Sequence, residues 1–236
     1  MNPPLDVPPL HSPAPRGVLA GPVALAPSGV HDLRAARPSR PDDVPAVTRL
    51  RYPATAALVF AGVPGAGKST ALLRFFGSGA TETRPPTGPG GRVVVDSQHA
   101  RNRWTPRLRR LPYPLWRPVV QCAHYATIRR ALRSASGPVI IHDCGTFRWS
   151  RALIARWSRA CGRPLHIVMI DVPPPLARAG QRRRGRRSSG LFFALHCKRW
   201  AELVGSVTEG RPARVASVVL ADRAAINRLS GIDLDA

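Results

Sequence analysis

Lysine, methionine and acidic residues are scarce in this 236-residue chain. Only Lys68 and Lys198 are lysines among the 36 basic residues, methionine occurs twice, and 13 acidic residues leave a formal net charge of +23. Such a balance is typical of proteins that bind nucleic acid or phosphorylated substrates. Arginine, alanine and proline are abundant together, however, which is the composition of a GC-rich coding sequence. Part of the charge therefore carries no information about function.

Long apolar runs and paired cysteine motifs are also missing. No stretch of 18 uninterrupted apolar residues occurs, so we expect no helix that crosses a membrane. The four cysteines show no CxxC spacing and no paired histidines, which argues against a zinc site and a disulfide framework. We expect a protein of the reducing cytoplasm. The alternative is export, suggested by a weakly apolar segment over residues 17–26 that Gly21 and Pro22 interrupt.

The first 50 residues differ in composition from the rest of the chain. They hold 11 of the 26 prolines and balance five arginines against four aspartates, which predicts a disordered tail over residues 1–50. The other 186 residues carry a net charge of +22 and are long enough for one α/β core. We therefore expect a folded domain over residues 51–230 and a short C-terminal tail over residues 231–236.

From residue 55 onward, short apolar runs rich in β-branched residues alternate with helical patterns. This alternation predicts an α/β fold with a five-stranded, mostly parallel sheet and helices on both faces. The expected strands cover residues 56–61, 92–95, 138–142, 165–170 and 215–220. The expected helices cover residues 68–76, 115–133, 147–160, 174–184 and 192–204. In the third of these helices, the apolar face is expected to consist of Trp149, Leu153, Trp157 and Ala160.

The most specific motif is a phosphate loop over residues 62–70. It matches the pattern GxxxxGK[ST] and lies between a predicted strand and a predicted helix, as the pattern requires. Its glycines let successive backbone N–H groups surround phosphate oxygens, and the helix N-terminus attracts the anion. We expect Lys68 to contact the β- and γ-phosphates of ATP and Ser69 to hold Mg²⁺. The predicted nucleotide-binding residues are Gly62, Val63, Pro64, Gly65, Ala66, Gly67, Lys68, Ser69 and Thr70.

Three aspartates, Asp96, Asp143 and Asp171, follow predicted strands, at the edge where open α/β sheets bind ligands. Asp143 ends a strand of Walker-B type and is expected to hold Mg²⁺ directly or through water. Asp96 is expected to accept the proton of an attacking hydroxyl, while Arg101 holds an acidic acceptor. His99 could serve as the base instead of Asp96, or it could be an exposed loop residue with no part in the reaction. Each aspartate could instead be a helix N-cap, which is the favoured interpretation for Asp171.

Two further features bear on the reaction. Asp143 is followed by Cys144, whereas motor and unfoldase ATPases usually place a glutamate there to activate water, so the sequence favours transfer to another acceptor. Arginines concentrate in residues 178–187, and a lid can use arginines to stabilise charge that develops on a phosphoryl group. Arg182 and Arg186 are therefore predicted catalytic residues. A solvated basic run and a nucleic-acid surface are the alternatives.

Over about residues 55–225, these motifs together resemble small P-loop kinases of the polynucleotide 5′-kinase, gluconate-kinase and zeta-toxin type. Uncharacterised relatives of these kinases are often labelled AAA family ATPases. The resemblance implies the sheet order 2-3-1-4-5, a base on the acceptor side, a carboxylate on the magnesium side, and a lid contact. The residues that correspond to these roles are Asp96 for the base, Asp143 for the carboxylate, Arg182 or Arg186 for the lid, and Arg101 and Arg148 for the acceptor.

The chain departs from that family pattern in two places. Arg101 lies five residues after Asp96, farther than the Asp-x-x-Arg spacing of polynucleotide kinases, and Cys-Gly-Thr follows Asp143 where Ala-Thr-Asn-like segments are usual. The acceptor is therefore left open. We expect a Mg²⁺- and ATP-dependent phosphotransferase with a hydroxyl acceptor, for which a nucleic acid is one candidate. The alternative is an ATPase that uses ATP as a switch, either bound to nucleic acid or as a regulator.

Overall fold

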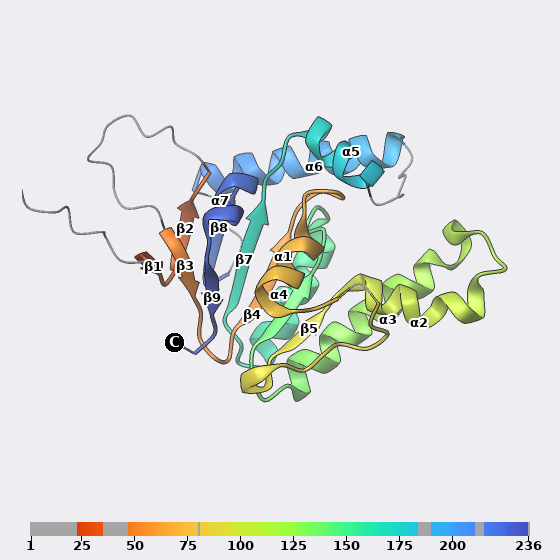
Figure 1. The fold of residues 1–236 in the computed structure, drawn as a ribbon, viewed down its shortest axis with the longest axis horizontal. Coiled ribbons are helices and arrows are strands. Elements are labelled where there is room, and N and C mark those ends of the chain that lie inside the picture. Colours follow the sequence, from red (N-terminus) through yellow and green to blue (C-terminus); the bar gives the residue numbers. More distant parts are fainter. Residues whose placement is uncertain (1–22, 35–46, 80, 184–189, 211–214, 236) are drawn as a thin grey trace, which may run out of the picture.

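The computed structural model describes residues 23–34, 47–79, 81–183, 190–210 and 215–235. Its centre is a six-stranded sheet in which every pairing is parallel (Figure 1). In spatial order the strands are β2 (Gly29–Asp32), β8 (Ser217–Ala221), β7 (Leu165–Ile170), β4 (Ala57–Ala61), β6 (Val139–His142) and β5 (Val93–Val95). The five predicted strands are present, and their order β5-β6-β4-β7-β8 confirms the expected 2-3-1-4-5 arrangement.

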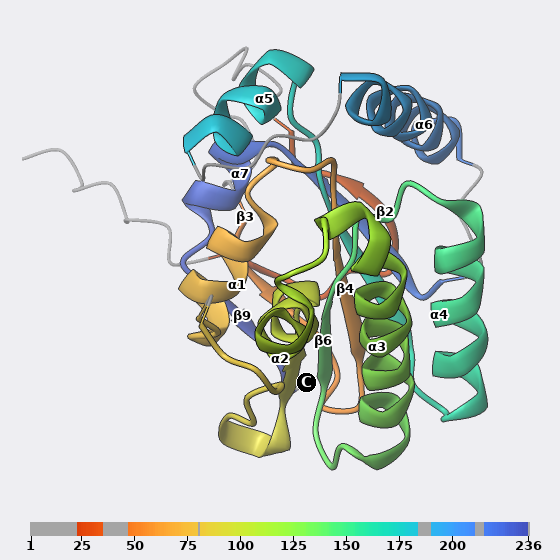
Figure 2. The ribbon, with the colours of Figure 1, turned by 90° about the vertical axis from the view of Figure 1, so that its right-hand side faces the viewer.

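Helices cover both faces of this sheet. Figure 2 shows α1 and α7 on one side, and α3, α4 and α6 on the other. Because both faces are covered, every residue of β4, β7 and β8 is buried, which explains why these strands are apolar apart from His166 and Ser217, whose side chains lie 2.8 Å apart. The helices are α1 (Lys68–Phe76), α2 (Ser97–Leu108), α3 (Tyr113–Ser134), α4 (Arg148–Ala160), α5 (Pro174–Arg183), α6 (Gly190–Thr208) and α7 (Arg223–Arg228), with a short 3₁₀ turn over Pro89–Gly91.

Residues near both ends of the chain form strands, contrary to the tails predicted over 1–50 and 231–236. The edge strand β2 pairs with β8 from Gly29 to Asp32. A second parallel sheet has the order β1-β3-β9, formed by β1 (Val23–Leu25), β3 (Val47–Arg51) and β9 (Gly231–Asp233). The prediction is therefore wrong at these residues, because strand pairing supplies backbone hydrogen bonds that composition does not reveal. The rest of the predicted N-terminal tail, 1–22 and 35–46, lies outside the described residues.

Two helical predictions also need correction. Helix α2 is absent from the predicted helices, because its apolar residues are few and it contains Pro106. It is held by a cluster with α3 in which Ala100, Trp116 and Val120 are buried, so tertiary packing outweighs weak local preference. In α4 the buried residues are Ser150, Ile154 and Ser158 rather than the predicted face, and Trp149 is 55% exposed.

No helix in the described part of the chain is both long and apolar enough to span a bilayer.

Arg163 joins the loops at the amino-terminal edge of the main sheet, opposite the phosphate loop. Its guanidinium donates to the carbonyls of Leu132 (2.8 Å), Gly137 (2.9 Å), Thr55 (3.2 Å) and Ala135. We expect Arg163→Ala to lower the free energy of unfolding by about 2 kcal/mol, because several carbonyls lose a charged donor. Urea denaturation measures the change. The matched control is Arg133→Ala at an exposed position of α3, and an equal loss in both variants would contradict this role.

Candidate functional site

The phosphate loop joins β4 to α1 in a conformation that needs glycine. Gly65 has φ 92° and Gly67 has φ 111°, a region that side chains disfavour. A Cβ atom at Gly65 would lie 2.1 Å from the Ala177 carbonyl oxygen of α5, whereas a Cβ at Gly67 would have no neighbour within 4 Å. The first turn of α1 is free of a side-chain cap, as an anion-binding helix end requires.

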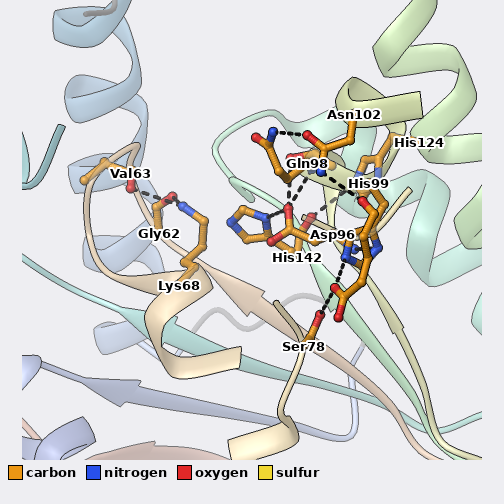
Figure 3. Close-up of polar contacts among 12 residues, drawn as sticks. Gly62, Val63, Lys68, Ser78, Asp96, Gln98, His99, Asn102, His124 and His142 are labelled. Carbon is orange, nitrogen blue, oxygen red and sulfur yellow. Dashed lines mark hydrogen bonds and ion pairs between the residues drawn. The ribbon is translucent and has the colours of Figure 1, made fainter. Parts of the chain in front are cut away.

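Lys68 is the first residue of α1, and its ammonium group lies within the loop. Its Nζ donates to the carbonyl oxygens of Gly62 at 2.5 Å and Val63 at 3.1 Å (Figure 3). The residue is only 6% exposed, so its positive charge is held at the loop. The structure thus places Lys68 where the sequence motif predicts a phosphate contact, with Ser69 half-buried beside it and Thr70 exposed.

Asp143 follows β6 and is buried at the same edge of the sheet. Its two carboxylate oxygens accept from the backbone N–H of Gly145 at 2.6 Å and from the hydroxyl of Tyr125 at 2.7 Å. Burial and the Asp143 charge raise the pKa of Tyr125, so the phenol keeps the proton that it donates. Asp143 is not the N-cap of α4, because Phe147 occupies that position. The structural alternative is therefore wrong for this aspartate.

The donor set at this edge fits Mg²⁺ chemically. Ser69 supplies a hydroxyl and Asp143 a carboxylate, and oxygen ligands are the ones that Mg²⁺ prefers. Within the described ranges, no group of three or more His, Cys, Asp or Glu side chains is placed to hold a metal by itself. A magnesium ion here would therefore need phosphate oxygens and water to complete its shell, as in other nucleotide sites.

Asp96 lies one strand further along the sheet and pairs with a histidine that the sequence analysis missed. Its Oδ1 is 2.6 Å from Nδ1 of His142 and accepts from the Gln98 N–H at 2.8 Å. Burial opposes ionisation of Asp96, but the charge and hydrogen bond of His142 outweigh it and hold the pKa of the carboxyl well below its usual range. Figure 3 shows the His142 ring on the same side of Asp96 as Lys68. Asp96 is also the N-cap of α2, so the structural alternative that the sequence left open is confirmed for this aspartate.

His99, the alternative base, is placed differently. It is buried in the first turn of α2 with 2% exposure, so the expectation of an exposed loop residue is wrong. Its Nε2 is 3.2 Å from a carboxylate oxygen of Glu82, and its Nδ1 lies 3.4 Å from the backbone nitrogen of Asp96. These contacts join α2 to the segment after α1, which is a structural role.

The predicted acceptor and lid arginines are dispersed around this edge. Arg101 lies over the ring of Tyr113, 4.5 Å from its centroid, so it packs within the α2–α3 hairpin. Arg148 is exposed at the start of α4 and lines a cavity that also contains Asp143. Arg182 is exposed on α5, and Arg186 lies outside the described residues.

Helices α5 and α7 each contact the phosphate loop through a residue that was not among the predicted site residues. Gln181 donates to the Pro64 carbonyl at 2.9 Å, and Arg223, at the start of α7, donates to the Gly65 carbonyl at 3.1 Å. A cavity of about 250 Å³ lies between the loop, α5 and α7, and both Arg183 and Asn227 line it. No local pattern marks Gln181, since it lies in an arginine-rich run, and only its place on α5 reveals the contact.

The loop after Asp143 is anchored by α6. The hydroxyl of Thr146 is 2.7 Å from Nδ1 of His196, and the rings of Phe147 and Phe192 pack against the same imidazole at 5.1 and 4.4 Å between centroids. Burial, with the nearby positive charges of Lys68, Arg117 and Arg199, lowers the pKa of His196 to about 4. A neutral histidine therefore connects the loop after Asp143 to α6 at neutral pH.

Residues 58–206 match the family model described as an AAA domain. The chain belongs to this family. Together with the loop geometry and sheet order, the match confirms the predicted resemblance to small P-loop kinase-like NTPases. A search among curated proteins returned no match.

Two solved structures are similar to part of this AAA-domain protein. One comes from work on the PezAT chromosomal toxin-antitoxin system of the human pathogen Streptococcus pneumoniae, with 15% identity, a TM-score of 0.41, and coverage of 57% of this chain and 54% of that one. The other is a tunicamycin resistance protein of Deinococcus radiodurans, with 17% identity, a TM-score of 0.41, and coverage of 64% and 82%. The chain thus spans about half the length of the first. Similarity at this level supports no conclusion about activity.

The contact between the loop and α5 predicts that Gly65→Ala weakens nucleotide binding. The new methyl group would lie 2.1 Å from the Ala177 carbonyl, at a backbone φ of 92°, so the loop or α5 must move. We expect at least a tenfold loss of ATP affinity, measured by calorimetry or with a fluorescent ATP analogue. Gly205→Ala is the control, since Gly205 lies within α6 and its Cβ would have no neighbour within 4 Å. Unchanged affinity in Gly65→Ala would show that the packing is dispensable.

His124, buried on α3, predicts a loss of stability in acid. Burial lowers its pKa to about 4 from 6.5, so between these values the unfolded chain binds a proton that the folded chain excludes. Stability should therefore fall as the pH falls from 7 to 5, by about 2 kcal/mol for this one group. Denaturation of His124→Gln at both pH values should show a correspondingly smaller fall. Thr127→Ala on the same helix removes a hydrogen bond without a titrating group, and should lower stability equally at both pH values.

Proposed function

We propose that this AAA-domain protein is a kinase that transfers the γ-phosphoryl group of Mg²⁺·ATP to a hydroxyl group of an acceptor. The observation that carries the proposal is the Asp96–His142 pair, with 2.6 Å between its atoms, beside the phosphate loop on the same edge of the sheet. A base at this position suits an acceptor hydroxyl. A switch ATPase needs no such pair on the acceptor side.

The chain's own residues bind and orient the nucleotide in this proposal. The uncapped N-terminus of α1 and the ammonium of Lys68 hold the phosphates, and Ser69 and Asp143 would hold the magnesium ion. When bound, Mg²⁺ neutralises charge on the β- and γ-phosphate oxygens. The adenine base occupies the cavity of about 250 Å³ beside the loop, where α5 and Arg223 of α7 border it.

The proton of the acceptor hydroxyl passes to the His142–Asp96 pair. Because the low pKa of Asp96 keeps it ionised, its carboxylate accepts from Nδ1–H of His142 and thereby selects the tautomer with an unprotonated Nε2. That nitrogen takes the proton as the hydroxyl oxygen attacks, and Asp96 stabilises the imidazolium that forms. Asp96 then acts through His142. Arg101 and Arg148 orient an acidic acceptor, and Arg182 with Arg186 of the lid stabilises charge on the transferred group.

A second candidate function is a nucleic-acid-binding ATPase in which ATP acts as a switch. It is favoured by the α2–α3 hairpin, which extends beyond the sheet edge (Figure 1). The exposed arginines of this hairpin are Arg103, Arg107, Arg109 and Arg110, and no acidic residue occurs over residues 97–117. Phosphate backbones bind such surfaces regardless of sequence. A cytoplasmic location belongs to both proposals.

The test is transfer of label from γ-labelled ATP with Mg²⁺, with and without a 5′-hydroxyl oligonucleotide and a set of small polyols and hydroxy acids. We expect Lys68→Ala and His142→Gln each to lower transfer by a factor of about 10² to 10⁴, because each removes stabilisation of the transition state. Asp96→Asn should lower transfer while ATP affinity stays unchanged. Arg129→Gln, at an exposed position of α3, is the control.

Label on an acceptor that is lost in these variants supports the kinase. Label released only as inorganic phosphate, at a rate that the oligonucleotide raises, supports the switch ATPase. Turnover that survives Lys68→Ala would contradict the site assignment in both functions.

A further inference from the structure

A cavity of about 1050 Å³ lies between α4, α6 and the face of the main sheet that these helices cover. Its floor is apolar and consists of side chains from β4, β7 and β8, among them Val59, Ile167, Met169 and Val218. This volume is at the upper end of the range for small-molecule binding pockets. The proposed kinase mechanism uses only one end of the cavity, where Asp143 and Arg148 lie.

The sequence of α4 explains why the space is not filled by the protein. Of the α4 residues that line it, Ala152 and Ala155 are small and Ile154 is the one buried apolar side chain. The others are Trp149, which is 55% exposed, and the arginines Arg148, Arg151, Arg156 and Arg159. Protein cores are normally packed as densely as organic crystals, because each unfilled apolar volume forfeits dispersion contacts. An apolar sheet faced only by Ile154 and two alanines of α4 is therefore better explained by an occupant than by core packing.

The rim of the cavity is positively charged. Five arginines line it, whereas its acidic lining residues are Asp143 and Glu202. Among the described residues, no carboxylate forms an ion pair with any of these five guanidinium groups. The arginines are Arg148, Arg151, Arg156, Arg159 and Arg199.

Two of these arginines lie close together at the end of the cavity next to Asp143. Arg151 is half-buried and donates to the Gly145 carbonyl at 2.5 Å. Burial, with repulsion from Arg148, lowers the pKa of Arg151. An anionic group beside Arg148 and Arg151 would offset both effects, because it supplies the charge partner that burial requires.

We propose that this cavity binds an amphipathic anion, whose apolar body lies on β4, β7 and β8 and whose carboxylate or phosphate group contacts Arg148 and Arg151. The apolar floor binds the apolar body of such a molecule, and the basic rim binds its anionic group. The inference concerns binding alone, so it does not depend on phosphoryl transfer. The anionic end then lies beside the nucleotide site, since Asp143 lines the same end.

The test uses the full chain and calorimetry with dodecyl phosphate and laurate, below their micelle concentrations. Dodecanol has the chain without the charge, and inorganic phosphate has the charge without the chain. We expect both anions to bind saturably with one site per chain, and each partial probe to bind at least tenfold more weakly. The two anions distinguish a phosphate from a carboxylate head group.

Three variants connect the binding to this cavity. Ala155→Phe places a ring in the space, and Arg148→Gln with Arg151→Gln removes the anion contacts, so each should weaken dodecyl phosphate binding at least tenfold. Arg199→Gln tests the rim without changing Arg151, in case loss of the Gly145 contact unfolds the chain. Arg129→Gln on α3 does not line the cavity and should bind normally, and urea denaturation verifies that each variant folds.

Three results would overturn the inference. The first is no saturable binding of either anion. The second is binding that Ala155→Phe and Arg199→Gln leave unchanged, which would assign it to the general positive charge of the surface. The third is dodecanol binding as tight as that of dodecyl phosphate and laurate, which would show an apolar cavity that does not select an anion.

Discussion

Parallel pairing of β6 with both β4 and β5 is the constraint on which the site depends. The register places Phe60 opposite His142 and Val95 opposite Ile141. The phosphate loop and Asp143 consequently begin at the same edge of the sheet, and Asp96 follows directly beside His142. A shift of one residue in either pairing would turn the side chain of His142 to the other face of the sheet. The short Asp96–His142 contact is thus a consequence of backbone hydrogen bonding along the strands.

Among the described residues, the carboxylates of Asp96 and Asp143 are bound by a tyrosine, a histidine and backbone N–H groups, and not by arginine, although the chain is rich in arginine. Asp143 accepts from Tyr125 and a backbone N–H, and Asp96 from His142 and a backbone N–H. Of the three strand-end aspartates, Asp171 is the one that pairs with a described arginine. Its carboxylate accepts from Arg34 and from the indole N–H of Trp200. The N-cap role predicted for Asp171 is therefore wrong, because α5 begins only at Pro174 and the carboxylate instead joins Arg34 to Trp200. The pairing of Asp171 with Arg34 leaves the arginines near Asp143 available for an anion.

The parts of this protein that could be predicted are those encoded over a few consecutive residues. The phosphate loop depends on glycines, a lysine and a serine within residues 62–70, and the buried strands depend on short apolar runs that a doubly covered parallel sheet requires. By contrast, β2 pairs with β8 across nearly 190 residues of chain, and α2 is held by a cluster with α3. Their local sequences are weak because their stability comes from distant partners.

The sequence by itself therefore determined the nucleotide-binding loop and the candidate aspartates at strand ends. The order of the strands followed from the family resemblance that its motifs carry. Only the tertiary structure decided which groups those aspartates contact: His142, Tyr125 and backbone N–H groups, none of which a spacing rule selects. It also decided that α5 rests on Gly65 and that α4 and α6 leave a cavity over the sheet. The physical reason is that a motif records which groups are adjacent in the chain, whereas pKa values, cavities and proton acceptors depend on groups brought together by packing.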